Sequence, residues 1–228
     1  MESQSKVGAV IVAAGSSERM GMVDKVTALL GGKPIPARVV STCENSHLVN
    51  QIVIVVNEMN LEPWEHLVKE NSWSKVSDIC PGGKRRQDSV ATGLDRLRDC
   101  RWAVIHDGAR PFLTEDLIKR GVKAAEETGA ATAAVPVTDT VKVAEDDMFV
   151  QETPARKHLW AVQTPQVFRY DMITSAHRQI KNEVTDDASL VEKLGYRVKL
   201  YMGAYDNIKI TTPSDLALAE VLLKKHEK

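Results

Sequence analysis

Charged side chains recur in this sequence at turns and at the ends of apolar runs. They are Arg19 and Lys25 after residues 7–14, Lys84, Arg85 and Arg86 after Gly82-Gly83, Asp107 and Arg110 after residues 102–106, then Arg156 and Lys209. Cations gathered in a pocket stabilise the charge of a phosphoryl-transfer transition state. A single carboxylate such as Asp107 suits Mg²⁺, which binds through one or two carboxylates plus substrate phosphates. Each charge alone is most simply a solvated surface residue, so the prediction of phosphate chemistry rests on their joint placement.

The stretch from Val7 to Lys25 combines an apolar run with a turn and two cations. Residues 7–14 have the length and β-branched content of a buried strand, and Gly15-Ser16-Ser17 is typical of a tight turn with outward-facing N–H groups. Such a turn after a strand can hold phosphate. A plain core strand followed by a charged loop is the alternative. The stretch matches neither the dinucleotide fingerprint nor the P-loop.

Strand and helix patterns alternate along most of the chain. We expect strands at 7–14, 51–56, 76–80, 102–106, 130–137, 197–202 and 208–210. We expect helices near 34–44, 61–70, 89–97, 114–128, 170–180 and 187–194 and from 212 onward. This alternation predicts an α/β, Rossmann-like fold with a mostly parallel twisted sheet and helices on both faces. The carboxyl ends of such strands converge, so the charges above are expected to meet there.

The alternation fails between Thr138 and Trp160. Residues 141–143 and 148–151 look like two short strands around an acidic turn, which predicts an inserted β-hairpin. A hairpin this short cannot bury its own apolar residues. It is either a surface flap or, as we favour, a dimerisation arm spanning residues 138–160.

Composition excludes several classes of protein. The chain has 228 residues, 43% hydrophobic and 27% charged, with a net charge of -1, which favours neither a nucleic-acid nor a membrane partner. The polar N-terminus is unlike a signal peptide, and no apolar run approaches the roughly 20 residues of a membrane span. The three cysteines are far apart in the sequence and do not have the spacing of metal ligands, so we expect them to be reduced thiols. We therefore expect a single cytoplasmic domain over residues 1–228.

Two further residues have ordinary interpretations. His106 could act as a base, but a histidine at a strand end is more often packed and hydrogen-bonded. Ser89 lacks the surroundings of a nucleophile and more simply serves as a helix-start hydroxyl or a ligand contact.

Several motifs together carry a family resemblance. The loop from Ala13 to Gly21 resembles the signature loop of sugar-phosphate nucleotidylyltransferases. Further motifs follow in order: Gly82-Gly83 with Asp88-Ser89-Val90, His106-Asp107-Gly108-Ala109-Arg110-Pro111, Asp139-Thr140-Val141-Lys142, Gln163-Thr164-Pro165-Gln166, Thr185-Asp186-Asp187-Ala188-Ser189 and Asn207-Ile208-Lys209-Ile210-Thr211. Over nearly the whole chain they resemble the 2-C-methyl-D-erythritol 4-phosphate cytidylyltransferase family of the non-mevalonate isoprenoid pathway. Ribitol-5-phosphate cytidylyltransferases share most motifs, but the 185–189 segment looks more like the methylerythritol branch.

The resemblance implies a reaction, a metal and a role for each matching residue. A polyol phosphate would attack CTP and release pyrophosphate, with Mg²⁺ bound by Asp107 and a homodimer formed through the 138–160 arm. The implied nucleotide-binding residues are Ala13, Ala14, Gly15, Ser16, Ser17, Gly83, Ser89 and Asp107. The implied catalytic residues are Arg19, Lys25, Arg156 and Lys209, and the implied substrate-binding residues are Arg110, Thr140, Arg156, Asp186 and Lys209.

The first loop departs from the family pattern. The family usually has more glycine where this chain has Ser16-Ser17-Glu18, and Pro-Lys-Gln where this chain has Asp24-Lys25-Val26-Thr27.

A non-catalytic nucleotide-binding module is the alternative from a different class. The retained set of Arg19, Lys25, Asp107, Arg156 and Lys209 speaks against it.

Overall fold

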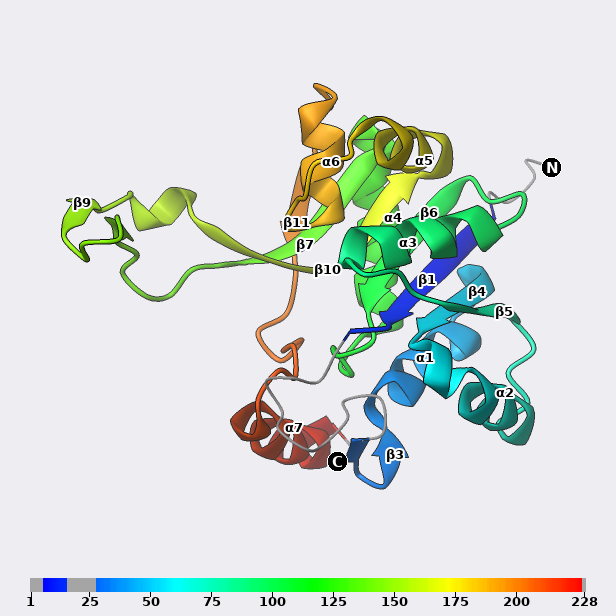
Figure 1. The fold of residues 1–228 in the computed structure, drawn as a ribbon. Coiled ribbons are helices and arrows are strands. Elements are labelled where there is room, and N and C mark those ends of the chain that lie inside the picture. Colours follow the sequence, from blue (N-terminus) through cyan, green and yellow to red (C-terminus); the bar gives the residue numbers. More distant parts are fainter. Residues whose placement is uncertain (1–5, 16–27, 227–228) are drawn as a thin grey trace.

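A seven-stranded sheet is the centre of the computed structural model, which describes residues 6–15 and 28–226 (Figure 1). Its strands are β1 (Val7–Ala13), β4 (Val49–Val56), β5 (Val76–Pro81), β6 (Trp102–Asp107), β7 (Ala130–Pro136), β10 (Trp160–Arg169) and β11 (Lys199–Met202). Their order is β11-β7-β10-β6-β1-β4-β5, and only β10 runs antiparallel to its neighbours among these strands. The expected mostly parallel sheet is confirmed.

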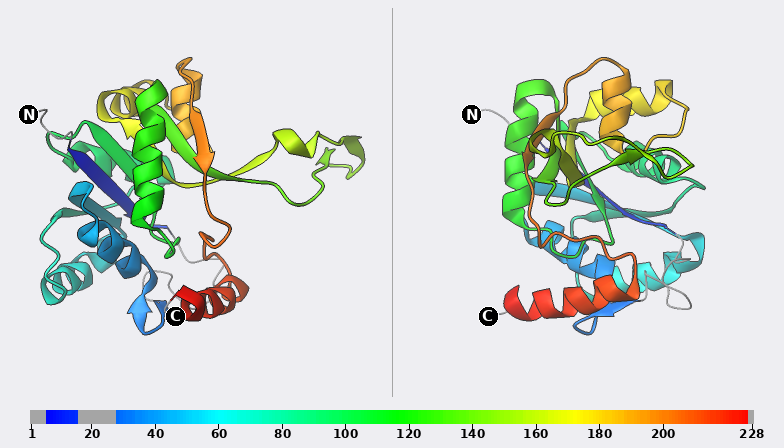
Figure 2. Two further views of the ribbon diagram at one scale, coloured as in Figure 1. Left: turned by 180° about the vertical axis from the view of Figure 1, so that it is seen from behind. Right: turned by 90° about the vertical axis from the view of Figure 1, so that its left-hand side faces the viewer.

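Helices cover both faces of the sheet, as the alternation predicted (Figure 2). One face packs on α1 (Ile35–Asn45), α2 (Leu61–Glu70) and α4 (Glu115–Thr128), the other on α3 (Arg86–Arg96), α5 (Tyr170–Gln179) and α6 (Asp187–Lys193). Successive β1 side chains alternate between the two cores: Ala9 and Ile11 join the first, and Val10 joins the second. Because both faces are covered, β1 is apolar throughout instead of alternating with polar residues.

Local signals in the sequence predicted the helix ends well. Thr114 precedes α4, and its hydroxyl accepts a hydrogen bond from the Leu117 N–H at 3.2 Å. Gly129 ends the helix with a φ of 85°, the left-handed conformation that glycine favours. Lys33 and Pro34 belong to a short strand, so α1 begins at Ile35, just after the expected start.

Two expectations about strands were wrong. The sequence analysis assigned no strand to residues 160–169, yet β10 lies in the middle of the sheet. Its buried Gln163, Thr164 and Gln166 interrupt any apolar run, and hydrogen bonds satisfy these side chains instead. Conversely, residues 208–210 form no strand; they lie in an irregular segment that bonds the Ala109 carbonyl through Ile210.

The C-terminal segment closes the carboxyl end of the sheet. There α7 (Pro213–His226) packs through Ala219 and Leu223 on a two-stranded sheet of β2 (Leu29–Leu30) and β3 (Lys33–Pro34). A 3₁₀ turn, η2 (Glu58–Asn60), leads into α2. Within the residues described, no helix is both long and apolar enough to cross a membrane.

The predicted hairpin is confirmed as an arm that projects from the body (Figures 1 and 2). It contains β8 (Val143–Ala144), β9 (Val150–Glu152) and the 3₁₀ turn η3 (Arg156–His158). Met148 is 81% exposed and Phe149 72% exposed at its tip. The arm therefore leaves large apolar side chains uncovered by the chain that carries it.

Candidate active site

Two adjoining cavities lie at the carboxyl end of the parallel strands. The first, of about 460 Å³, is lined by residues that follow β1, β5 and β6, including Ala13, Ala14, Gly15, Gly83, Ser89 and Asp107. The second, of about 450 Å³, lies toward β10 and α6 and includes Arg110 and Asp186. Arg86, Asp107 and Lys209 line both cavities. The convergence expected from strand order is therefore confirmed for these residues.

The glycine turn after β5 lets two loops approach closely. A Cβ on Gly82 would lie 2.3 Å from Ala14 Cβ, and one on Gly83 would lie 2.4 Å from Asp88 Cβ. The Gly83 N–H donates to Ser89 Oγ at 3.1 Å, and Ser89 Oγ donates to the Arg85 carbonyl at 3.2 Å. Ser89 is thus a hydroxyl in the first turn of α3, which stabilises the wall of the first cavity.

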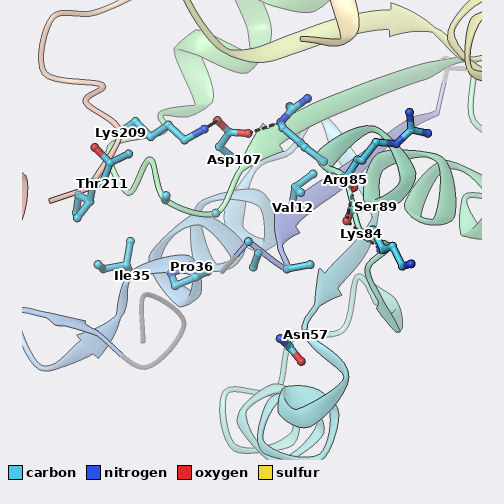
Figure 3. A pocket seen from close by; sticks show the side chains of 18 residues that line it. Val12, Ile35, Pro36, Asn57, Lys84, Arg85, Ser89, Asp107, Lys209 and Thr211 are labelled. Carbon is cyan, nitrogen blue, oxygen red and sulfur yellow. Dashed lines mark hydrogen bonds and ion pairs between the residues drawn. The ribbon is translucent and has the colours of Figure 1, made fainter. Parts of the chain in front are cut away.

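Lys84 is a cation on that wall. Its side chain is exposed and makes no ion pair or hydrogen bond with the described residues. Figure 3 places it beside Ser89 and Arg85. A free ammonium at a cavity wall is available to an anionic ligand.

Asp107 stands between the two cavities with a cation on each carboxylate oxygen. Arg86 Nε donates to Oδ1 at 3.0 Å. Lys209 Nζ lies 2.7 Å from Oδ2 (Figure 3). Arg110 Nε is more distant, at 3.9 Å from Oδ2. Burial opposes ionisation of Asp107, but the charges of Arg86 and Lys209 outweigh it and hold the pKa well below its usual range. Asp107 is therefore a carboxylate at neutral pH.

Arg86 connects the site to α6. Its Nη1 donates at 2.7 Å to Oδ2 of Asp187, a side chain only 1% exposed. Burial disfavours the Asp187 carboxylate, but the Arg86 charge more than compensates and lowers the pKa. The Arg86 guanidinium is consequently held by Asp187 while it donates to Asp107.

A hydrogen-bonded pair beneath Asp107 fixes its backbone. Thr164 Oγ1 accepts from the Asp107 N–H at 3.1 Å and lies 3.1 Å from His106 Nδ1. His106 Nε2 lies 3.0 Å from the Arg110 carbonyl, which can only accept, so we assign the ring proton to Nε2. Burial lowers the pKa of His106 to about 4. The packed, hydrogen-bonded histidine expected from the sequence is confirmed.

Asp186 has a structural role beside its place in the second cavity. Its Oδ1 accepts from the Ser189 N–H at 3.0 Å and caps α6, and its Oδ2 accepts from Gln166 Nε2 at 2.7 Å. The expected contact between Asp186 and the substrate stays a prediction.

Other predicted residues lie elsewhere. Thr140 and Arg156 are on the arm and line neither cavity; Arg156 Nη1 donates to the Thr138 carbonyl at 2.7 Å. Ser16, Ser17, Arg19 and Lys25 lie outside the described residues, so their roles stay predictions.

Arg86, Asp187 and Thr164 are site residues that the sequence analysis did not assign. Arg86 was one of three adjacent cations, and nothing in that run distinguished it from its neighbours. Asp187 and Thr164 fall inside motifs that were noted, so motif membership was the available signal.

A glycine turn and a cation-flanked carboxylate at the carboxyl edge of a mostly parallel sheet suit the transfer of phosphate-containing groups, which is the chemistry of a nucleotidyltransferase. The family model described as 2-C-methyl-D-erythritol 4-phosphate cytidylyltransferase matches residues 7–225. A protein with that name from Dehalococcoides mccartyi is 54% identical over 220 residues, which are 96% of this chain and 97% of the relative. The chain belongs to this family.

Other relatives and solved structures agree over nearly the full length. The 2-C-methyl-D-erythritol 4-phosphate cytidylyltransferase from Alkaliphilus oremlandii is 45% identical over 230 residues, which are 98% of each chain. The 4-diphosphocytidyl-2C-methyl-D-erythritol synthase structure from Anaerococcus prevotii has a TM-score of 0.86 at 29% identity, covering 97% of each chain. The cytidylyltransferase structure from Thermus thermophilus has a TM-score of 0.78 at 30% identity, covering 96% of this chain and 99% of that one. The protein is a CTP-dependent enzyme that transfers a cytidylyl group to 2-C-methyl-D-erythritol 4-phosphate in isoprenoid biosynthesis.

Proposed function

We propose that CTP occupies the first cavity and 2-C-methyl-D-erythritol 4-phosphate the second, with the reacting phosphates meeting beside Asp107. The observation that carries this proposal is the wall of Arg86, Asp107 and Lys209 that the two cavities share. Gly15, Gly83 and Ser89 would hold the nucleotide with Ala13, Ala14, Ser16 and Ser17. Arg110 and Asp186 would contact the polyol phosphate.

The reaction needs positioning more than proton transfer. An oxygen of the polyol phosphate attacks the α-phosphorus of CTP in line, the bond from that phosphorus to the bridging oxygen of the β-phosphate breaks, and pyrophosphate leaves with the bond's electron pair. A phosphate monoester has a second pKa near 6, so the nucleophile is already ionised. Lys209, at the shared wall, would orient the attacking phosphate, and Arg19 and Lys25 would stabilise charge on the triphosphate.

A divalent cation such as Mg²⁺ fits Asp107. No three His, Cys, Asp or Glu side chains cluster into a metal site within the described residues, which suits a metal held by one carboxylate plus substrate phosphates. Ionised Asp107 would supply that carboxylate. The metal would neutralise phosphate charge during the transfer.

We propose that the enzyme is a homodimer joined through the 138–160 arm. The arm exposes Val143, Met148, Phe149 and Val150, which a second copy could cover. In that arrangement Thr140 and Arg156 would serve the partner's site, which accounts for their distance from the cavities of their own chain. The free thiols of Cys43, Cys80 and Cys100 suit a reducing cytoplasm.

The direct experiment measures pyrophosphate release from CTP and Mg²⁺ with each polyol phosphate. We expect release with 2-C-methyl-D-erythritol 4-phosphate and far less with ribitol 5-phosphate. Lys209→Ala should reduce kcat/KM for the polyol phosphate more than it weakens CTP binding. Release unchanged in that variant would contradict the proposed arrangement of the two substrates.

Deleting residues 141–150 tests the dimer separately. We expect a halved mass in solution and a loss of activity, because Thr140 and Arg156 would no longer be held at a partner's site. A deletion that leaves mass and activity unchanged would remove the basis for a shared site.

A further inference from the structure

Lys209 lies on a segment that has no regular structure of its own. Residues 203–211 run between β11 and α7 without helix or strand. The Lys209 side chain is 41% exposed, yet its Nζ lies 2.7 Å from Asp107 Oδ2. A long, half-exposed lysine on an irregular segment loses much conformational freedom when it is held in one place. Something in the fold must therefore anchor the backbone around Lys209.

Asn207 provides that anchor two residues before Lys209. It is fully buried, and its Nδ2 donates to the Thr164 carbonyl at 2.7 Å. The Asn207 carbonyl accepts from Arg110 Nη1 at 2.7 Å. On the other side of Lys209, the Ile210 N–H donates to the Ala109 carbonyl at 2.8 Å. Lys209 thus sits between two points of attachment to the neighbouring segments.

Thr164 joins this anchor to Asp107. Its hydroxyl accepts from the Asp107 N–H, while its carbonyl accepts from the Asn207 amide. One residue of β10 therefore holds both the backbone of the carboxylate and the segment that carries the lysine. The hydrogen bond between Asn207 and Thr164 thus links the Asp107 backbone to the segment that carries Lys209.

The two ends of the Asn207 amide have different surroundings. Asn207 Oδ1 is buried without a hydrogen-bond partner among the described residues, which is unfavourable for folding. The amide therefore contributes through its Nδ2, which gives the Thr164 carbonyl its donor.

We propose that Asn207 is a positioning residue for cytidylyl transfer, which places the Lys209 ammonium beside Asp107 by tying the 203–211 segment to Thr164. The inference rests on the proposed role of Lys209. Removing the amide leaves the segment beside Lys209 held by its backbone hydrogen bonds to Arg110 and Ala109, and a displacement near 1 Å can cost on the order of 100-fold in rate.

The test is a double-mutant cycle of Asn207→Ala with Lys209→Ala, measured as kcat and KM for both substrates. We expect Asn207→Ala alone to lower kcat/KM for the polyol phosphate by roughly 10- to 100-fold. In the Lys209→Ala background the same change should have an effect below about threefold, because the lysine that Asn207 positions is already absent. Asn50→Ala is the matched control: its Oδ1 accepts from the Val7 N–H at the opposite edge of the sheet, and its activity should be unchanged.

The outcomes separate this proposal from the one beneath it. If Lys209→Ala retains full activity, the proposed role of Lys209 fails first. If Lys209→Ala is impaired but Asn207→Ala has the same effect in both backgrounds, Asn207 is merely structural and this proposal is overturned. Should Asn207→Ala not fold, Asn207→Leu keeps the side-chain shape without the donor, and the same comparison between the two backgrounds decides.

Discussion

Replacing Arg86 with methionine would break the ionic connection between the sheet and α6. Arg86 bridges Asp107 at 3.0 Å and Asp187 at 2.7 Å, and its own side chain is 28% exposed. Asp107 would keep Lys209, whereas Asp187 would keep only His177, whose Nε2 lies 3.3 Å away without hydrogen-bond geometry. Arg86→Met therefore leaves one deeply buried carboxylate without its main partner.

The size of the effect follows from burial. Removing one member of a buried ion pair costs about 3–5 kcal/mol, because the remaining charge is left uncompensated. For a chain of this size each kcal/mol lowers Tm by about 2–4 °C, so we expect a decrease of roughly 6–20 °C. Arg96→Met is a matched control on the same helix. Arg96 pairs with Asp78 at 2.8 Å, but both side chains are substantially exposed, so the expected cost is about 0.2–1 kcal/mol.

Thermal unfolding of both variants, followed by circular dichroism at several pH values, measures the difference. Arg86 lowers the pKa of Asp187, so the stability from this pair is present above the unfolded-state pKa and is lost as the pH falls through the folded-state pKa. The gap in Tm between parent and Arg86→Met should therefore be widest near neutral pH and narrow below about pH 4. Adding Asp187→Asn to Arg86→Met should recover part of the loss. The reasoning is refuted if Arg86→Met costs no more than Arg96→Met.

Three further predictions concern pH, the nucleotide and catalysis. The folded-state pKa of His106 is about 4, below its unfolded-state value, so the protein loses stability as the pH falls from about 6.5 to 4. Urea unfolding should show the free energy of unfolding decrease by about 3 kcal/mol over this range, and the decrease should be absent in His106→Gln. Gly82→Ala would place a Cβ 2.3 Å from Ala14 Cβ, so calorimetry should show weaker CTP binding by about 1–3 kcal/mol, and unchanged affinity would contradict the tight loop contact. Arg19→Ala or Lys25→Ala should lower kcat by roughly 10²–10³-fold in the pyrophosphate assay, and near-parental activity in both would favour the non-catalytic module.

Apolar patterns in the sequence predicted most of the fold because they are local. Strands buried on both faces must be continuous apolar runs, so β1 and β4 were evident from their residues. The cap of α4 was equally evident, since Thr114 and Gly129 act on backbone groups within a few residues. The motifs indicated the reaction through their resemblance to a known family.

Contacts between residues far apart in the sequence could not be predicted from such local patterns. Gln163 and Thr164 are polar, so β10 lacks the apolar run that marks a buried strand. Their burial depends on hydrogen-bond partners contributed by other segments. Arg86 and Asp187 are 101 residues apart, and no local rule selects Arg86 from its cationic neighbours.

The sequence by itself therefore determined most of the strands and helix ends, which depend on interactions between near neighbours, and its motifs carried the resemblance that gave the class of chemistry. Only the tertiary structure decided which cations face Asp107 and what holds them there. Lys209 reaches that carboxylate from an irregular segment held to Thr164 by Asn207. The physical reason is that hydrogen bonds and ion pairs between distant segments form only once the sheet has brought its carboxyl ends together.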